Sequence, residues 1–343
     1  MNFAHYHFVI VMLFAVVAHG ADSSTRPAAK SFMWKSIYGT VLHDANRDKD
    51  LPLTLHIPEA PGPHPLIVFS HGAGGSGGNY NGITTRWASR GYVVIAPTHA
   101  DSISLLPPND RRGVRAGKLV RDVLNDADGW ANRARDVTFI LDSLDELERL
   151  VPRLAGKIDR DRIGVAGHSY GAHTAQVIAG TKIRIKPGGE LQSFADPRVK
   201  AALLMSGQGE GQMGLVEGSW DALRIPLMVM TGSEDRGAKG QDPMWRKAPF
   251  THSAAGDKYW VLIEGATHSS FVGRLADITT GGGLRRAEDP QPQRDHKGIF
   301  HAVQQLTIAF WDAHLRDDAQ AEQLLQSGKL AKDASVPVTF ETR

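Results

Sequence analysis

Cysteine is absent from the 343 residues. Without a thiol the chain has no disulfide, thiolate metal site, cysteine nucleophile or lipoprotein anchor. A surplus of one charge is also lacking, since 39 Lys and Arg stand against 37 Asp and Glu. We therefore do not expect a basic face for nucleic acid. Hydrophobic residues make up 41% of the chain and charged residues 22%, which are values of a globular protein. The length allows one large α/β domain or two smaller ones.

An unbroken apolar run is found at residues 8–18, near the start of the chain. Its length is that of a signal peptide and too short to cross a bilayer. Ala18 and Gly20 are small residues at the positions expected for cleavage after Gly20. No Lys or Arg precedes the run, so an uncleaved anchor is the alternative. We expect a signal peptide at 1–20, a protein secreted to the periplasm or medium, and a disordered polar leader at 21–35.

Short apolar runs of strand type alternate with helical patterns in the rest of the chain. The strand-like runs cover residues 36–42, 51–57, 65–70, 92–96, 162–166, 199–205, 226–231 and 259–264. Apolar residues keep a helical spacing in 133–151 and 299–315. This alternation predicts an α/β fold, a doubly wound and mostly parallel sheet with helices on both faces. We place this domain at 36–315 and a charged C-terminal tail at 316–343.

Three polar segments interrupt the alternation, at residues 101–130, 182–197 and 279–297. Long loops on a compact sheet often serve as binding loops or lids. Idle surface insertions are the alternative for each of them. The expected fold is therefore a doubly wound sheet with lid-like loop insertions.

The pattern G-x-S-x-G occurs at Gly167-His168-Ser169-Tyr170-Gly171. It follows a predicted strand and opens a helix of small residues. A strand-to-helix reversal this sharp strains the serine backbone and needs glycines beside it, and it pushes the serine hydroxyl above the sheet. We take Ser169 as the candidate nucleophile; an ordinary Gly-Ser turn is the alternative.

A serine hydroxyl needs a base to take its proton and an acid to orient that base. Asp235 and His268 each stand just past the end of a later predicted strand. The carboxyl ends of parallel strands meet at one edge of the sheet, where ligands bind. The candidate acid is Asp235, with Glu234 as the alternative, and the candidate base is His268.

The developing oxyanion needs backbone donors. The amide of Tyr170 is one candidate, and the amide of Ala73, in the loop after residues 65–70, is the other. Among neighbouring histidines, His71 is expected to brace that loop and His168 to pack in the elbow. His173 is expected in the first helical turn behind the serine, and His99 as a possible pocket wall.

The same loop contains a rival pattern, because Gly72, Gly74 and Gly77 satisfy the dinucleotide-binding spacing G-x-G-x-x-G. Two predicted strands precede it, and the next strand ends in Ala96-Pro97, where an acidic ribose ligand should stand. No Lys-Ser or Lys-Thr follows the glycines, which excludes a Walker phosphate loop. A nicotinamide-dependent dehydrogenase is therefore the weaker interpretation.

The chain resembles the α/β-hydrolase superfamily and, within it, the serine esterases of the platelet-activating-factor acetylhydrolase and dienelactone-hydrolase-like group, relatives of cutinase-like polyester hydrolases. The stretches that carry the resemblance are 65–75 (PLIVFSHGAGG), 91–96 (GYVVIA), 136–144 (DVTFILDSL), 167–171 (GHSYG), 232–235 (GSED) and 265–268 (GATH). The resemblance implies the same roles for Ser169, Asp235 and His268, and oxyanion amides at Ala73 and Tyr170.

Departures from the family patterns concern the substrate. Dienelactone hydrolase uses a cysteine nucleophile, whereas Ser169 stands here. Polyester hydrolases often carry Met after the serine and a disulfide near the end, whereas this chain has Tyr170 and no cysteine. The elbow continues Gly171-Ala172, where these families more often have two glycines.

The sequence therefore predicts a secreted serine hydrolase of carboxylic esters, with short-acyl or small esters favoured because 101–130 is rich in Asp and Arg. A platelet-activating-factor-acetylhydrolase-like phospholipase, a polyester hydrolase and a non-catalytic hydrolase-fold binding protein are the alternatives. We expect no cofactor, metal or nucleic-acid partner, no stable membrane span after signal removal, and a small-molecule ester or lipid-like substrate.

Overall fold

The computed structural model describes residues 31–272 and 295–343. The expected signal peptide and residues 21–30 lie outside this range. Within it, nine strands form one mixed sheet, and two further strands form a small hairpin. The strands are β1 (Trp34–Asp44), β2 (Lys49–Pro58), β3 (His64–Ser70), β4 (Val93–Pro97), β5 (Ile158–His168), β6 (Ile183–Arg184), β7 (Leu191–Gln192), β8 (Val199–Met205), β9 (Leu227–Gly232), β10 (Lys258–Ile263) and β11 (Val338–Thr342).

The large sheet has the order β1-β2-β4-β3-β5-β8-β9-β10-β11. The six strands from β4 to β10 in this order are parallel to their neighbours. Antiparallel pairs close the two edges, β1 with β2 and β2 with β4 on one side and β10 with β11 on the other. The α/β-hydrolase architecture predicted from the sequence, a doubly wound and mostly parallel sheet, is therefore confirmed.

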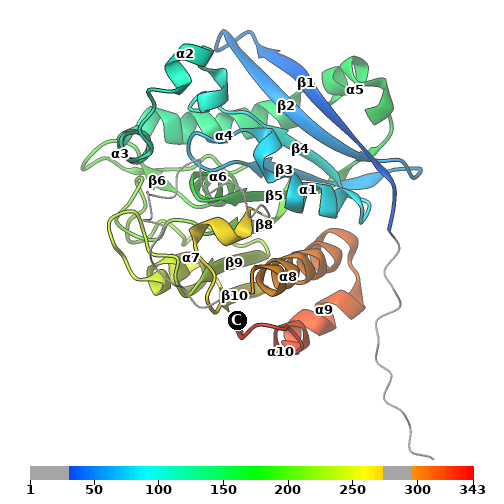
Figure 1. The fold of residues 1–343 in the computed structure, drawn as a ribbon, viewed down its shortest axis with the longest axis vertical. Coiled ribbons are helices and arrows are strands. Elements are labelled where there is room, and N and C mark those ends of the chain that lie inside the picture. Colours follow the sequence, from blue (N-terminus) through cyan, green and yellow to red (C-terminus); the bar gives the residue numbers. More distant parts are fainter. Residues whose placement is uncertain (1–30, 273–294) are drawn as a thin grey trace, which may run out of the picture. The chain divides into compact units, whose positions relative to one another are not determined.

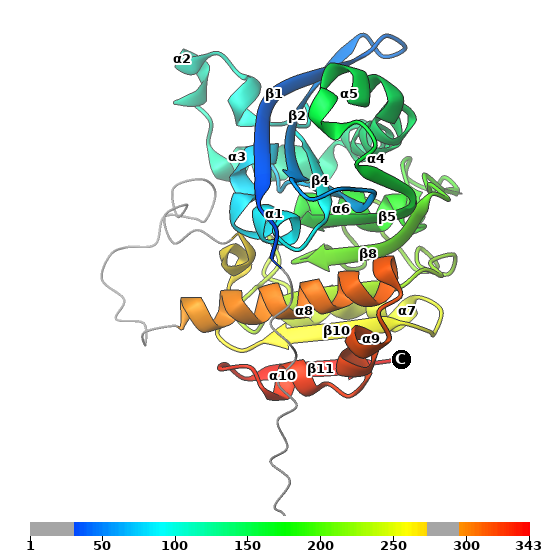
Figure 2. The same cartoon turned by 90° about the vertical axis from the view of Figure 1, so that its right-hand side faces the viewer.

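Helices cover both faces of this sheet (Figures 1 and 2). They are α1 (Asn81–Ala88), α2 (Pro108–Arg111), α3 (Ala116–Asn125), α4 (Ala127–Asp142), α5 (Leu144–Leu150), α6 (Tyr170–Ile178), α7 (Ala248–His252), α8 (His296–Arg316), α9 (Ala319–Gln326) and α10 (Lys329–Lys332). Alternate strand residues supply the two cores. Leu66 and Val68 pack with α4, α5 and α6, while Ile67 and Phe69 pack with α1 and α8. Burial on both faces explains the continuous apolar runs.

The C-terminal boundary differs from the sequence-based prediction. Residues 316–343, expected as a charged tail, contain α9, α10 and β11, and β11 pairs with β10 from Tyr259 opposite Thr342 to Ile263 opposite Val338. An ion pair between Lys247, in the turn before α7, and Glu341 also holds β11 against the domain. The strand was missed because its five residues are half-buried or exposed and form no apolar run; pairing with β10 holds it in the sheet.

Two smaller differences concern the start of the domain and a helix break. Strand β1 begins at Trp34, inside the expected leader, and the Phe32 amide already donates to Ser89 O at 2.7 Å. The helix expected at 133–151 is divided at Ser143, whose amide bonds the last carbonyls of α4 while α5 starts at the next residue. The apolar spacing continues across this break, so periodicity alone could not reveal it.

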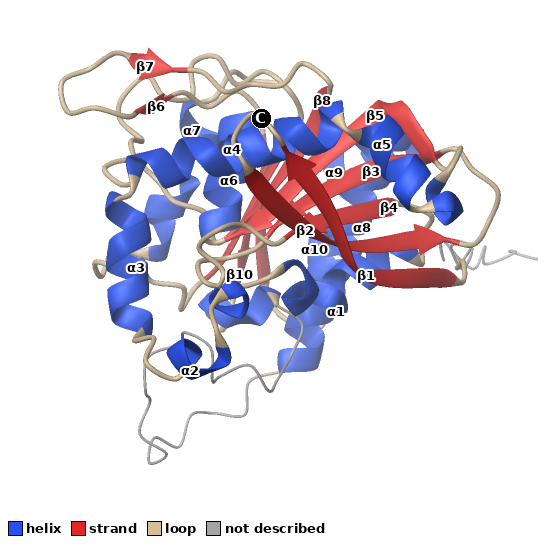
Figure 3. Cartoon of the chain, turned by 90° about the horizontal axis from the view of Figure 1, so that it is seen from above, coloured by secondary structure: helices blue, strands red, loops and turns tan. Residues whose placement is uncertain are grey.

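The three polar segments also acquire structure where it is described. Residues 101–130 hold α2, α3 and the first turn of α4, and 182–197 hold the β6–β7 hairpin. Most of 279–297 lies outside the described residues. Seen from above, α2 and α3 lie toward the edge at which the parallel strands converge (Figure 3). No helix within 31–272 and 295–343 is long and apolar enough to span a membrane.

Candidate active site

Ser169 occupies the sharp turn between β5 and α6. Its backbone has φ 56° and ψ −119°, a strained conformation for a residue with a side chain. A Cβ on Gly167 would lie 2.1 Å from Gly171 O, and one on Gly171 would lie 1.8 Å from Ser70 O. Both flanking positions thus require glycine for steric reasons. The predicted nucleophile elbow has the geometry that exposes a serine hydroxyl at the carboxyl edge of the sheet.

Asp235 and His268 meet at the same edge. Asp235 follows β9 and is fully buried, and its Oδ1 lies 2.8 Å from His268 Nδ1. The neighbouring Glu234 is exposed, so the geometry favours Asp235 over that alternative. Among the described residues, no hydrogen bond joins the Ser169 hydroxyl to His268; such contacts are often long in free enzymes and tighten when substrate binds.

Arg246 is a partner of Asp235 that the sequence did not single out. Arg246 is 3% exposed, and its guanidinium donates to Asp235 Oδ1 at 2.8 Å and also to Ser206 O and Gly207 O. Thr231 donates its hydroxyl to Asp235 Oδ2 at 2.7 Å. Burial by itself would raise the pKa of Asp235, but the neighbouring His268 and Arg246 outweigh it and hold this pKa well below its usual value. The carboxylate is therefore ionised and fixed in place.

His168 connects three loops of the site. Its Nε2 lies 2.7 Å from His268 O, and its Nδ1 lies 2.9 Å from the Tyr80 hydroxyl. The Gly72 amide donates to the same hydroxyl at 3.0 Å. Burial, helped by the nearby His268, lowers the pKa of His168 to about 3, so the ring is neutral and can accept from Tyr80 while donating to His268 O. His168 was expected to pack in the elbow. In the structure it also joins, by hydrogen bonds, the segments that carry Ser169 and His268.

Among residues 72–75, in the loop after β3, one amide is left for an oxyanion. The Gly72 amide bonds Tyr80, the Gly74 amide bonds Asp101 at 3.0 Å, and the Gly75 amide bonds Gly72 O at 3.1 Å. The amide of Ala73 has no acceptor among the described residues. The amide of Tyr170, at the first position of α6, cannot have an intrahelical acceptor either. These are the two amides that the sequence proposed.

The same contacts argue against the dinucleotide interpretation. All three amides of its glycines have internal acceptors, those of Gly72 and Gly74 as above and that of Gly77 at Thr98 Oγ1, 3.1 Å away. A pyrophosphate-binding loop must keep such amides free for the ligand.

Within the part of the chain that the structure describes, no group of three or more His, Cys, Asp or Glu could hold a metal ion.

Another serine, histidine and aspartate, here joined by hydrogen bonds, lie close to the loop after β3. Ser70 Oγ is 2.9 Å from His99 Nε2, and His99 Nδ1 is 2.8 Å from Asp136 Oδ2. Ser70 is 2% exposed and the other two are 0% exposed, so no substrate reaches them. His99 was expected as a possible pocket wall; that prediction is wrong, because packing of β3, β4 and α4 encloses the ring.

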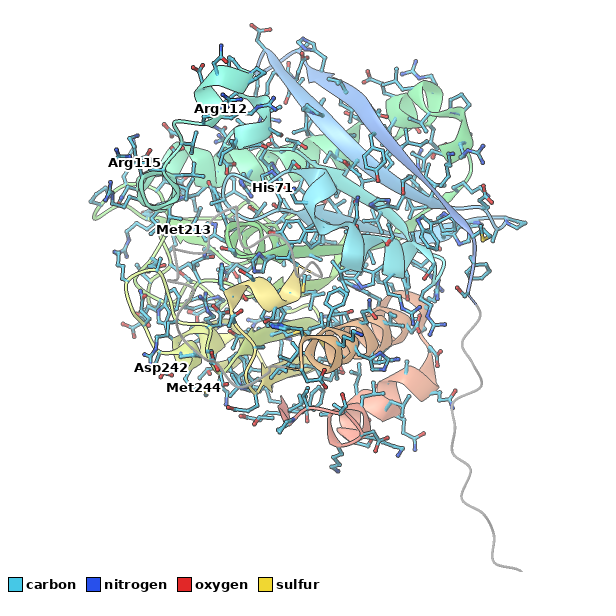
Figure 4. All side chains as sticks on the ribbon, viewed as in Figure 1. His71, Arg112, Arg115, Met213, Asp242 and Met244 are labelled. Atoms are coloured by element: carbon cyan, nitrogen blue, oxygen red, sulfur yellow. The ribbon has the colours of Figure 1, made fainter. Side chains whose placement is uncertain are left out.

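The remaining expected histidines lie where predicted. His71 Nδ1 is 2.6 Å from Gly72 O, and its Nε2 accepts from the His99 amide at 3.0 Å, so it braces the loop. His173, in the first turn of α6, lies 2.9 Å from Met213 O through its Nε2. Figure 4 shows His71 near the middle of the ribbon, with Arg112 and Arg115 on the segment of α2 and α3.

The sequence of this chain is similar to that of platelet-activating factor acetylhydrolases. The family model described as "Platelet-activating factor acetylhydrolase, isoform II" matches residues 25–106. The platelet-activating factor acetylhydrolases of Bos taurus and Canis lupus familiaris are 28% and 29% identical to the chain, each over 39% of it. These matches span 36% of each relative's length.

A solved structure extends the similarity to the whole fold. The ferulic acid esterase from Streptomyces cinnamoneus superimposes with a TM-score of 0.57 at 21% identity, covering 93% of this chain and 98% of that one. At this identity the similarity concerns the fold. The chain thus has the α/β-hydrolase fold and resembles the platelet-activating factor acetylhydrolases.

Proposed function

We propose that the protein is a serine hydrolase of carboxylic esters. The observation that carries the proposal is the contact of buried, ionised Asp235 with His268 at the sheet edge where Ser169 occupies a strained elbow. A histidine oriented in this way can act as general base toward a serine hydroxyl. The sequence similarity to acetylhydrolases supports the same reaction class.

In the proposed reaction, Ser169 Oγ attacks the ester carbonyl carbon and its proton passes to His268 Nε2. The tetrahedral oxyanion accepts hydrogen bonds from the amides of Ala73 and Tyr170. When the C–O bond to the alcohol breaks, His268 gives its proton to the leaving oxygen. Water then attacks the acyl-enzyme while His268 takes one of its protons. When the C–O bond to Ser169 breaks, His268 returns that proton to Ser169 Oγ and the carboxylic acid is released.

Initial rates on p-nitrophenyl esters from acetyl to palmitoyl test this reaction. We expect hydrolysis of the short-acyl esters and its loss in Ser169→Ala, whose fold is checked by circular dichroism. A fluorophosphonate probe should label the wild-type protein and spare the variant. Equal activity of variant and wild type would overturn the mechanism. A folded wild-type protein that neither cleaves an ester nor reacts with the probe would favour a non-catalytic binding protein.

A phospholipid with a short sn-2 acyl group is a second candidate substrate, favoured by the match to the acetylhydrolase family model. Acetate release from a 1-alkyl-2-acetyl phosphatidylcholine, compared with release of a long sn-2 acyl chain, separates this substrate from generic short esters. Preference for the phospholipid over p-nitrophenyl acetate in kcat/KM would support it. No cleavage of the phospholipid would exclude it and leave small esters.

We also propose that the protein is secreted, since residues 1–20 have the length and composition of a signal peptide. N-terminal sequencing of the mature protein, expressed with its full N-terminus in a bacterial host, tests this. A mature chain that starts at Ala21 in the periplasm or medium is expected. A cell-retained chain with an intact N-terminus would contradict secretion.

A further inference from the structure

Arg133 is a buried cation that the proposed reaction does not use. It lies on α4, its side chain is 3% exposed, and it faces both the loop after β3 and the start of α6. A buried charge is costly unless it is paired and fully hydrogen-bonded. The partners of this guanidinium therefore identify what it holds in place.

The first set of partners surrounds Ala73. Arg133 Nη1 donates to His71 O at 2.6 Å, two residues before Ala73. Its Nε and Nη2 donate to Asp101 at 2.7–2.9 Å, and Asp101 Oδ2 accepts the amide of Gly74, the residue after Ala73. The backbone is thus held on both sides of Ala73 through one guanidinium.

The second partner is Tyr170. The Arg133 guanidinium lies 3.9 Å from the centre of the Tyr170 ring, a close cation–π contact, and Tyr170 is 3% exposed. Tyr170 carries the other proposed oxyanion amide. One side chain therefore contacts both of the segments that must converge on the oxyanion.

We propose that Arg133 is a positioning residue for the oxyanion hole, setting the distance between the Ala73 and Tyr170 amides. This inference rests on the proposed function. Arginine suits the task because its planar fork can bond Asp101 with two nitrogens and His71 O with a third while its face stacks on the ring. Lysine has one nitrogen and no planar face, so it cannot make all of these contacts at once.

The positive charge of Arg133 has a second effect, on the carboxylate of Asp101. Asp101 brings a carboxylate to the Gly74 amide, close to the place where the oxyanion would form. Unpaired, that negative charge would oppose the developing negative charge of the transition state. The guanidinium neutralises it, so the loop keeps its anchor without the electrostatic penalty.

Arg133→Lys tests the proposal, with Arg135→Lys as the matched control. Arg135 lies on the same helix but is exposed, and its guanidinium is 5.5 Å from the Phe194 ring. The assay measures kcat and KM on p-nitrophenyl acetate and the inhibition constant of butylboronic acid, whose tetrahedral serine adduct places an oxygen in the oxyanion hole. Thermal unfolding and near-UV circular dichroism report the fold.

For a folded Arg133→Lys we expect kcat to fall about 10- to 100-fold, with KM nearly unchanged and the boronate bound more weakly. A merely structural role would raise KM along with the loss of kcat. The proposal is wrong if kcat is that of the wild type, or if KM rises as much as kcat falls. Arg135→Lys should match the wild type in all three quantities.

Asp101→Asn decides the question if Arg133→Lys does not fold. Asp101 is 18% exposed, and asparagine can keep one of the two contacts that the carboxylate makes. A lower kcat at constant KM supports the proposal, and an unchanged kcat overturns it. A wild-type protein without esterase activity would instead overturn the proposed function, which keeps the two failures distinct.

Discussion

The Tyr80 hydroxyl lies 2.9 Å from Nδ1 of His168, although 88 residues separate them in the chain. The hydroxyl also accepts the Gly72 amide, and the far side of the His168 ring meets His268 O. Three loops that follow different strands are therefore joined by one tyrosine and one histidine. Loops that carry a proposed reaction need such cross-links, because no regular secondary structure fixes their relative positions.

Tyr80→Phe should destabilise the protein. The substitution leaves the buried Gly72 amide and His168 Nδ1 without a partner, at a cost of about 1–3 kcal/mol in the free energy of unfolding. Urea unfolding measures this value. Tyr38→Phe is the control, because Tyr38 is 58% exposed and, among the described residues, its hydroxyl accepts one hydrogen bond, from the half-buried Asn81 side chain; it should change stability by less than about 0.5 kcal/mol. Equal stability of both variants would contradict the linking role.

Asp235→Asn should abolish most of the ester hydrolysis while Glu234→Gln preserves it. Asparagine can no longer stabilise a protonated His268 or select its correct tautomer, and a fall in kcat on the order of 10⁴-fold is expected for such a change. Steady-state kinetics on p-nitrophenyl acetate give the comparison. If Glu234→Gln lost the activity and Asp235→Asn kept it, the acid would be the neighbouring residue.

Gly171→Ala should disrupt the elbow. The added Cβ would lie 1.8 Å from Ser70 O, a backbone atom of the interior strand β3 that cannot move without breaking the sheet. We expect loss of activity together with a lower thermal midpoint. Gly117→Ala serves as control, because a Cβ there has nothing within 4 Å and lies in α3. It should leave activity unchanged and stabilise the protein by up to about 1 kcal/mol.

Stability should fall in mild acid. Burial lowers the pKa of His168 to about 3 and that of His173 to about 4, from 6.5. The unfolded chain then binds protons below pH 6.5 that the folded protein does not, so stability is complete above pH 6.5 and is lost as the pH falls toward the folded pKa values. Each ring removes about 2 kcal/mol between pH 7.5 and pH 5.

Urea unfolding at the two pH values measures this loss. His173→Gln should show a smaller difference between pH 7.5 and pH 5, because glutamine has no proton to gain and can still donate to Met213 O. An unfolding free energy that is equal at both pH values in the wild-type protein would contradict the burial argument. The lowered pKa of Asp235 acts only in stronger acid, below the normal pKa of a carboxyl group.

The sequence by itself determined the features that depend on neighbouring residues. Continuous apolar runs located every parallel strand to within a few residues, because such strands are buried on both faces. The glycines around Ser169 indicated a turn that only glycine permits, and Asp235 and His268 could be chosen because each follows a strand that ends at the same edge. The end of α4 before Ser143 and the edge strand β11 were not predicted, since neither has a strong local pattern.

Only the tertiary structure decided which distant residues meet. Arg133, Arg246 and Tyr80 have no sequence motif, and their importance follows from where α4, the turn before α7 and the turn before α1 place them. Burial also separated two serine–histidine–aspartate sets, one enclosed around His99 and the other with His268 side chain 43% exposed at the sheet edge. Exposure depends on packing between segments far apart in the chain, which a linear pattern does not encode.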